Sequence, residues 1–228
     1  MHFAERGQDT LAGAFLALAT IKVHVLYLFL LVVAWWVVRE RRWRVVLGAV
    51  LAMALWIGAL LLIAPHSLAD YAQAVAQNPP TQWRTATLGG ALRSVFGPEH
   101  TWLQFLPAAL TVVLTGAWLL WRRPAISWPR DLAPVLLISA PAAIYGWSFD
   151  HTVLLVVFLL LLAWAVAGWR EARGHVVAIL AGLVLMEGIL FWQNQAGVND
   201  VYLLWTPFAL GGLYLYGRWR LDESRAVA

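Results

Sequence analysis

The fold is decided by residues 132–168, which read LAPVLLISAPAAIYG (132–146), WSFDH (147–151) and TVLLVVFLLLLAWAVAG (152–168). Two long apolar runs flank five residues that include Asp150 and His151, and neither run contains an acidic or basic side chain. Apolar runs of this length are typical of helices that cross a bilayer, because about 20 such residues span the hydrocarbon. An adjacent carboxylate and imidazole between two such helices indicate a functional role, since charge near hydrocarbon is costly.

Composition extends this interpretation to the whole chain. Apolar residues make up 62% of the 228 residues, charged residues only 12%, and the mean hydropathy is +0.71. Continuous apolar runs favour helices over the alternating strands of a membrane barrel. We therefore predict an all-α, polytopic transmembrane bundle in one domain, 1–228, with about seven spans. The expected spans are Leu11–Val38, Val45–Ile63, Phe105–Trp121, Leu132–Trp147, His151–Gly168, Val176–Trp192 and Val201–Tyr216.

The positions of the basic residues predict the orientation. Twelve of the 16 Lys and Arg residues fall in alternate connections and in the tail. By the positive-inside rule, these segments face the cytoplasm. The C-terminus is then cytoplasmic, and the N-terminus and the Asp150-His151 break face outward across the cytoplasmic membrane. Arginines at span ends fit membrane orientation better than nucleic-acid binding. They are Arg39, Arg41, Arg42, Arg44, Arg122, Arg123, Arg130, Arg170, Arg173, Arg218, Arg220 and Arg225.

Three spans carry irregular features. Leu11–Val38 would be about 42 Å long as one helix, so it is either tilted or broken near Lys22-Val23-His24. Pro141 and Pro207 each remove a helical hydrogen bond and are expected to kink their spans.

The outer loop, residues 65–104, is the longest polar connection. Ser67 followed by Asp70 is a capping pattern that opens a helix over Leu68–Gln77. A second helix is indicated by apolar residues at helical spacing from Leu88 to Phe96. We expect both to be short amphipathic helices at the outer interface.

Several side chains are candidates for chemistry. Asp150 and His151 are the catalytic candidates, as a pair that handles protons or hydrogen-bonds a ligand, although Asp150 also stands where an N-cap would open the next span. Lys22 is a candidate phosphate-binding cation with His24 close by, although Lys22 could instead snorkel or pair with Glu187.

Other candidates lie in the outer loop and beside the break. Arg84 and Arg93 could clamp a lipid phosphate or bind head groups without specificity. Trp147 joins them as a substrate-binding candidate, whereas Asp200 fits a loop residue or a cap for the last span better. The six His residues show no metal-ligand spacing, no glycine-rich phosphate loop occurs, and cysteine is absent, so we expect no metal and no cofactor.

Several motifs resemble a known family. They are residues 11–22, the apolar helix that ends at Arg39–Arg44, Asp70-Tyr71 with Asn78 onward, and Ser139-Ala140-Pro141 leading to 147–151. Together these stretches resemble the middle of GT-C class polytopic glycosyltransferases, particularly glycosyltransferase family 87. The resemblance implies an enzyme that moves a sugar, often mannose, from a polyprenyl-phosphate carrier to a lipid or glycan hydroxyl outside the cytoplasmic membrane. It also implies that Lys22 and His151 hold the donor phosphate.

One departure from the family pattern limits the expected activity. The family places the acidic base for the acceptor hydroxyl in an earlier outer loop, with several spans before the region that matches here. The chain therefore resembles the C-terminal half of such an enzyme, with a missing N-terminal half or a partner subunit. The alternatives are a transporter or flippase-like carrier of an anionic lipid or solute, and a non-catalytic membrane subunit. Carriers often contain internal repeats, and none is evident in this sequence.

Overall fold

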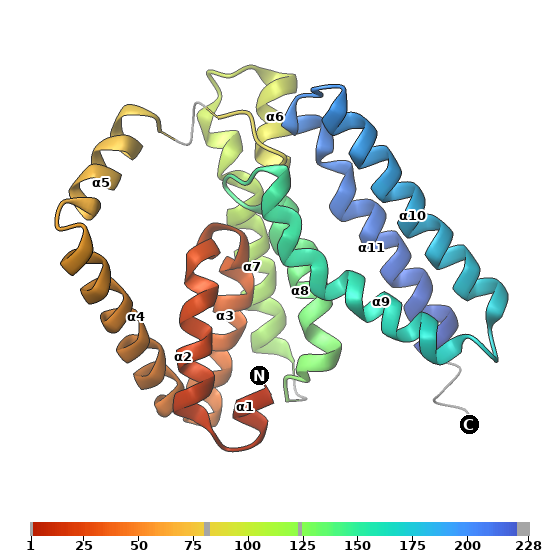
Figure 1. Ribbon diagram of the computed structural model, residues 1–228, viewed down its shortest axis with the longest axis horizontal. Helices are drawn as coiled ribbons and strands as arrows, with labels where there is room; N and C mark the ends of the chain where they lie inside the picture. The colour runs from red at the N-terminus through yellow and green to blue at the C-terminus, as the bar shows by residue number, and fades with distance from the viewer. Residues whose placement is uncertain (1, 80–82, 123–124, 223–228) are drawn as a thin grey trace.

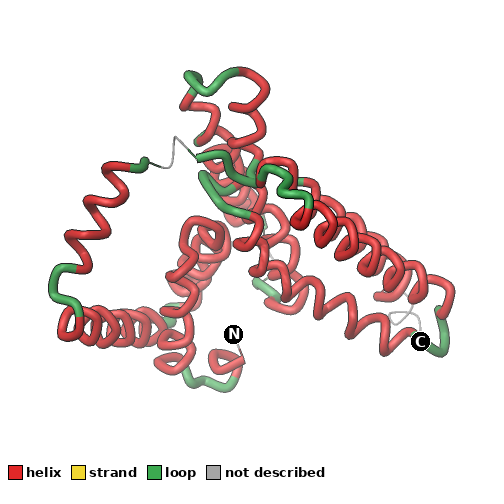
Figure 2. The backbone as a smooth tube through the Cα atoms, turned by 45° about the horizontal axis from the view of Figure 1, so that its top comes forward, coloured by secondary structure: helices red, strands yellow, loops and turns green. Residues whose placement is uncertain are grey.

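The computed structural model describes residues 2–79, 83–122 and 125–222, and within these ranges every regular element is helical (Figures 1 and 2). The α-helices are α1 (His2–Glu5), α2 (Asp9–Ala19), α3 (Val23–Glu40), α4 (Trp43–Ile63), α5 (Ser67–Gln77), α6 (Leu88–Phe96), α7 (Leu106–Trp121), α8 (Trp128–Ala142), α9 (Leu155–Gly168), α10 (Arg173–Gln195) and α11 (Trp205–Gly217). Tighter 3₁₀ turns form η1 (Thr20–Lys22), η3 (Thr101–Gln104), η4 (Ser148–Leu154) and η5 (Asp200–Leu203), and η6 (Arg218–Asp222) is a π-turn.

Four helical segments in the described part of the chain are long and apolar enough to cross a membrane. They are Asp9–Glu40, Trp43–Ile63, Ser148–Gly168 and Arg173–Gln195, and α7 is a shorter apolar helix. The sequence prediction of an all-α membrane protein is confirmed at this level.

The first of these segments is a hairpin. The Arg42 guanidinium donates to the Ala4 carbonyl at 2.7 Å and lies 3.3 Å from the Asp9 carboxylate, so the chain must turn back between residues 9 and 42. The turn is η1, at the predicted break. The prediction that the N-terminus and Arg39–Arg44 lie on opposite sides is wrong, because the apolar run hides a reversal that only these long-range contacts reveal.

Helices α2 and α4 cross closely through two glycines. A side chain at Gly13 would collide with the backbone of Val45, and one at Gly48 would collide with the backbone of Thr10. Small residues allow such close approach of helices in membranes, where van der Waals contact supplies much of the association energy. This crossing holds α4 against the hairpin, while the rest of α4 is largely exposed.

Two apolar clusters make up the core. One joins α8, α9, α10 and α11, and the other joins the α2–α3 hairpin with α4, α7 and α8. Helix α8 belongs to both, and Ser139 fixes it to α3 by donating to the Val25 carbonyl at 2.5 Å and accepting from the Leu28 amide at 3.4 Å. This link holds the first turns of α3 beside the end of α8.

The two prolines singled out in the sequence lie near helix ends. Pro141 is in the last turn of α8, which ends at Ala142. Pro207 lies in the first turn of α11, where its missing amide would have had no helical partner. No kink is required there. Both predicted outer-loop helices are present, as α5 and α6.

The molecule has two chemically different ends. The arginine end is the end where the Arg39 guanidinium donates to the Arg122 carbonyl, at 3.4 Å, and where Arg130 and Arg218 line one groove with Arg122. The Asp150 end is the opposite end, where η1, η4 and the segment before α6 meet (Figure 1).

Candidate functional site

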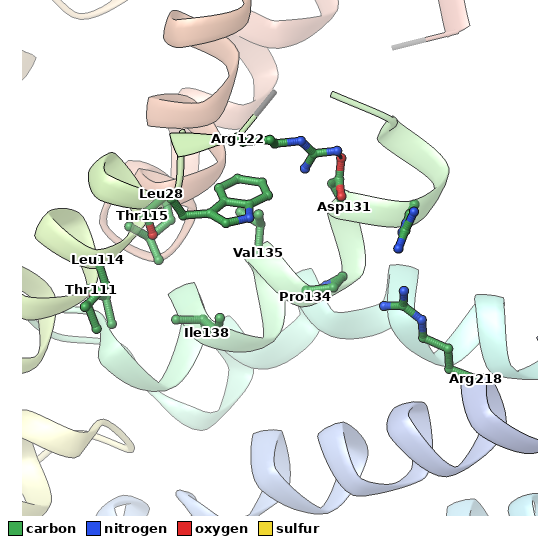
Figure 3. A pocket seen from close by; sticks show the side chains of 12 residues that line it. Leu28, Thr111, Leu114, Thr115, Arg122, Asp131, Pro134, Val135, Ile138 and Arg218 are labelled. Atoms are coloured by element: carbon green, nitrogen blue, oxygen red, sulfur yellow. Dashed lines mark ion pairs between the residues drawn. The ribbon is translucent and has the colours of Figure 1, made fainter. Parts of the chain in front are cut away.

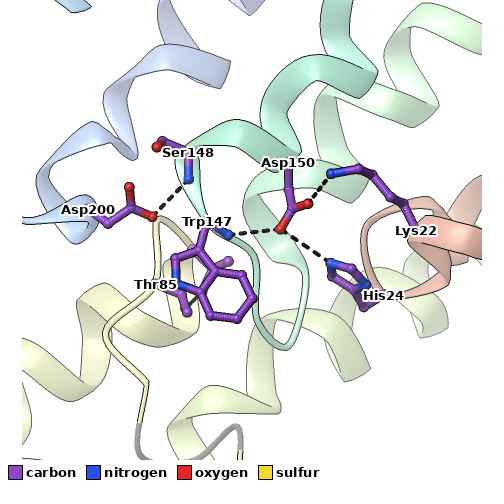
Figure 4. Close-up of polar contacts among 8 residues, drawn as sticks. Lys22, His24, Thr85, Trp147, Ser148, Asp150 and Asp200 are labelled. Carbon is purple, nitrogen blue, oxygen red and sulfur yellow. Dashed lines mark hydrogen bonds and ion pairs between the residues drawn. The ribbon is translucent and has the colours of Figure 1, made fainter. Parts of the chain in front are cut away.

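Asp150 is the centre of a cluster that joins distant parts of the chain (Figure 4). Its side chain is 3% exposed. Oδ1 forms an ion pair with the Lys22 ammonium, and Oδ2 lies 3.3 Å from His24 Nε2 and accepts the Trp147 backbone amide at 3.0 Å. The two basic partners are 128 and 126 residues away in sequence. The Lys22–Asp150–His24 cluster is therefore a tertiary feature of the fold.

The cluster forms because two helices break at the same level. The backbone at Lys22 leaves the helical region, with φ −119° and ψ 44°, and this turn presents the ammonium and then His24 at the start of α3. On the other side, α8 ends at Ala142 and the chain restarts as η4 at Ser148. The amide of Ser148 donates to the Asp200 carboxylate at 2.8 Å, which ties η4 to η5. Asp200 thus accepts an amide of η4 and not one of the last span, which the sequence analysis gave as the helix that it could cap.

Asp150 makes the capping contact that the sequence indicated, and it has two further partners. It accepts the Trp147 amide within the first turn of η4, as a capping residue does, and it also pairs with Lys22 and His24. Both carboxylate oxygens are engaged and buried. A base must reach the proton it removes, so this arrangement fits a positioning role for Asp150 better than proton abstraction. The ammonium-bearing side chain of Lys22 remains 31% exposed and accessible to an anion.

Aromatic rings surround the cluster. The Tyr145 ring stacks on His24 at 4.4 Å, and Trp83 lies 5.2 Å from Tyr145 and 4.8 Å from Trp147. Phe149 stacks on Trp147 at 5.7 Å, and the Lys22 ammonium lies 5.1 Å from the Phe149 ring centre. We call Trp83, Tyr145, Trp147 and Phe149 the aromatic wall.

Tyr145 contributes a hydroxyl as well as a ring. Burial raises the pKa of its phenol, and interactions with Tyr71 and the Asp150 charge raise it further. The phenol therefore stays neutral at physiological pH and keeps its proton as a hydrogen-bond donor.

His151 faces away from its neighbour in sequence. It lines a cavity of about 300 Å³ among η4, α9, α10 and α11, together with Glu187, Met186 and Phe158. Its Nε2 is buried and has no hydrogen-bond partner in the part of the chain that the structure describes. The two predicted catalytic side chains therefore lie in different surroundings, Asp150 in the Lys22–Asp150–His24 cluster and His151 in this cavity. The alternative Lys22–Glu187 ion pair is wrong, because Lys22 pairs with Asp150 and Glu187 lies in this second cavity.

Arg84 and Arg93 line a third pocket, of about 270 Å³, on the other side of Trp83. The Arg93 guanidinium donates to Gln104 Oε1 at 2.5 Å and to the Pro98 carbonyl at 2.8 Å, whereas Arg84 is exposed. Trp83 also lines this pocket, so it separates the two arginines from the Lys22–Asp150–His24 cluster.

A buried extended segment carries Trp83 to the aromatic wall. Thr85, Ala86 and Thr87 are fully buried, and the Ala86 amide donates to the Gly146 carbonyl at 2.9 Å. Thr87 then caps α6 by accepting the Gly90 amide at 3.1 Å. A side chain at Gly89 or Gly90 would collide with the backbone of Gln104 or Thr85. These glycines, which the sequence analysis left out, fix the position of the wall.

Trp83 and Tyr145 were missed by sequence reasoning. The chain has 15 Trp and 6 Tyr residues, so composition alone does not distinguish them. The available signal was local: Trp83 follows Pro79-Pro80 closely in the sequence, and Tyr145 precedes the Asp150 break. The described residues contain no group of three potential metal ligands among His, Asp and Glu.

Comparisons with protein-family models, curated proteins and solved structures found no match to this chain. The function is therefore argued from the site itself.

Proposed function

We propose that the chain forms the donor-binding part of a membrane glycosyltransferase, which moves a sugar such as mannose from a polyprenyl-phosphate donor to a lipid or glycan hydroxyl. The supporting observation is the Lys22–Asp150–His24 cluster beside the aromatic wall. A buried carboxylate holds two basic groups, one of them partly exposed, in contact with aromatic rings. Similar functional clusters are expected where charge is retained between membrane helices.

The cluster suits a phosphate leaving group. Negative charge grows on the phosphate as the glycosidic bond breaks, and fixed positive charge or hydrogen-bond donation at that point lowers the barrier. Lys22 supplies the charge, and His24 supplies a ring nitrogen held by Asp150. Because Asp150 fixes both groups before the donor binds, little reorganisation is needed during the reaction.

The aromatic wall suits the sugar. Aromatic rings bury large apolar surfaces with few rotatable bonds, and the C–H faces of a hexose can pack on them. Tyr145 adds a neutral hydroxyl that can hydrogen-bond a sugar hydroxyl. Trp147, predicted as a substrate-binding residue, belongs to this wall.

The acceptor base is expected from another segment, because both Asp150 oxygens are occupied. Family resemblance likewise implies an acidic residue from an earlier outer loop. Donor binding without rapid transfer is therefore the activity that we expect of the purified chain.

In the proposed membrane arrangement, α3, α4, α7, α8, α9, α10 and α11 cross the bilayer as the seven spans, and α2 is a shorter helix beside α3. The arginine end faces the cytoplasm by the positive-inside rule, with the C-terminus on that side. The Asp150 end then faces outward at the cytoplasmic membrane, where α5 and α6 would lie in the interface.

The test is binding of polyprenyl-phosphate mannose to the purified chain in nanodiscs. Lys22→Met removes a charge-assisted contact worth about 1.5–3 kcal/mol, so we expect the affinity to fall about tenfold or more. His24→Phe keeps the aromatic stack on Tyr145 but removes the ring nitrogens, and it is expected to weaken binding by a smaller factor.

Glu187→Gln is the matched control, because it removes a charge in the cavity of His151 at a distance from the cluster. It should leave donor affinity within about twofold of wild type. Donor binding that survives both Lys22→Met and His24→Phe would refute the proposal. Sugar transfer by the purified chain alone would show that the base is also present, with Asp70 as the exposed candidate.

A further inference from the structure

A groove at the arginine end is larger than either of the two pockets described above at the Asp150 end. It has a volume of about 520 Å³ and lies between α7 and α8, with Arg218 reaching toward it from the end of α11 (Figure 3). Its walls have two parts. One end is lined by the charged residues Arg122, Arg130, Asp131 and Arg218, and the rest by Leu28, Thr111, Leu114, Thr115, Trp118, Pro134, Val135 and Ile138.

The charges in the groove are unequal. Arg122 is engaged by Asp131, with a nitrogen–oxygen distance of 2.8 Å, and its guanidinium lies 4.8 Å from the Trp118 ring. Arg130 and Arg218 line the same groove and have no carboxylate partner within the described ranges. The mouth of the groove therefore carries two guanidinium groups that are available to a negatively charged ligand.

The apolar part of the groove is open to the surroundings of the helices. Leu114 is 57% exposed and Ile138 is 50% exposed, and the neighbouring Val113 on α7 is 66% exposed. If α7 crosses the bilayer, this face meets hydrocarbon. A water-soluble anion would contact only the arginines at the mouth and would not cover the apolar part of the groove.

The length of the groove fits one leaflet. Its lining on α7 extends from Thr111 to Arg122, which is about 16 Å along a helix. This is about half of the ~30 Å hydrocarbon thickness of a bilayer. The charged end would thus lie at the head-group level and the Thr111 end near the bilayer centre.

We propose that this groove is a binding site for an anionic phospholipid of the cytoplasmic leaflet. Arg130 and Arg218 bind the phosphate, as arginines do through charge-assisted hydrogen bonds, and one acyl chain lies along Leu114 and Ile138. The site is independent of the proposed donor site, because it is at the opposite end of the molecule and shares no residue with it.

The first experiment measures phosphatidylglycerol bound to the purified chain by native mass spectrometry, after exchange from detergent. We expect retention of phosphatidylglycerol over phosphatidylcholine. The double variant Arg130→Gln with Arg218→Gln is expected to lower the affinity for phosphatidylglycerol by about tenfold or more. The control variant, Arg44→Gln with Arg170→Gln, removes the same charge from exposed positions at the same end. It should change the affinity for phosphatidylglycerol by less than about twofold.

A second variant tests the acyl-chain part without changing any charge. Ile138→Trp fills the groove and should reduce retention of phosphatidylglycerol, whereas Val113→Trp, on an exposed position outside the groove, should not. Circular dichroism and monodispersity in detergent check that each variant is folded.

Three results would overturn the proposal. An equal loss of affinity for phosphatidylglycerol in the Arg44/Arg170 control variant would mean that net charge alone attracts the lipid. Full displacement of the lipid by inorganic phosphate or glycerol phosphate, together with no effect of Ile138→Trp, would mean a soluble-anion site. Equal retention of phosphatidylcholine would mean that the arginines do not select the ligand.

Discussion

Two carboxylates, one at each end of the molecule, differ in how far their partners lie along the chain. Asp131, at the arginine end, accepts the Ser127 amide at 2.8 Å and pairs with Arg122, so its contacts close a short connection. Asp150 pairs with Lys22 and His24, which are more than 120 residues away. The comparison teaches that similar ion pairs can have different structural roles: Asp131 shapes one loop, and Asp150 joins the α2–α3 hairpin to the α8–α9 break.

The largest expected effect comes from breaking the Asp150 cluster. Asp150→Asn leaves the Lys22 ammonium without its buried partner and is expected to lower the free energy of unfolding by about 3 kcal/mol. The 31% exposure of Lys22 keeps the effect from being larger, because water can solvate part of the charge. The measurement is denaturant unfolding in a mild detergent, followed by helical circular dichroism.

A double mutant distinguishes the ion pair from a general packing defect. Adding Lys22→Met to Asp150→Asn removes the unpaired charge, so the double variant should be more stable than Asp150→Asn alone. If the two losses simply add, Asp150 does not stabilise the fold through Lys22, and the contrast with Asp131 disappears.

This contrast also shows what the sequence could reveal. Helices α4, α7, α9 and α10 were predicted within a few residues, because long apolar runs bounded by arginines or polar loops determine them. The Lys22–Asp150 pair was not predicted, because the sequence gives no distance between residues so far apart. Glu187 was considered instead because it is the only carboxylate within the later predicted spans. A break at η1 was one of two alternatives, but the reversal of the chain there was not predicted, since Thr20–Lys22 lies within a continuous apolar run.

A smaller effect is expected at the link that supports the cluster. Ser139→Ala removes the hydroxyl that bonds both Val25 and Leu28, and it leaves the Val25 carbonyl without this partner. The expected loss of stability is about 1–2 kcal/mol. The same unfolding assay measures it, with Ser127→Ala as a control, because Ser127 contacts Asp131 through its backbone amide and not through its hydroxyl. A change at Ser139 no greater than at Ser127 would mean that α3 and α8 are held by apolar packing alone.

Asp131→Asn should have a smaller effect than either change at the Asp150 end. The pair with Arg122 is 10–12% exposed and local, and an asparagine oxygen can still accept the Ser127 amide. The Arg122 guanidinium also keeps its hydrogen bond to the Ala125 carbonyl, at 3.0 Å, and its contact with the Trp118 ring, so we expect a loss of about 1 kcal/mol although the pair is buried. Comparable losses for Asp131→Asn and Asp150→Asn would show that partner distance along the chain does not determine the effect of these carboxylates.

The smallest effect on stability is expected from a substitution at His151. This substitution extends the comparison to Asp150 and its neighbour in the sequence. Its Nε2 is buried without a hydrogen-bond partner in the described structure, and an unsatisfied polar atom costs free energy. His151→Phe removes that atom and retains a ring of similar shape, but it also removes the hydrogen bond between the imidazole and the Ala86 backbone. Because the two effects oppose each other, we expect a net change within about 1 kcal/mol. Unfolding of the variant measures it.

Donor binding by the same His151→Phe variant separates structure from function. Because His151 faces the cavity of Glu187 and not the aromatic wall, donor affinity should remain within about twofold of wild type, whereas His24→Phe should reduce it. Loss of binding in a stable His151→Phe protein would place the donor in the cavity of about 300 Å³ instead. Asp150 would then connect a ligand site on its His151 side with a purely structural ion pair on its Lys22 side.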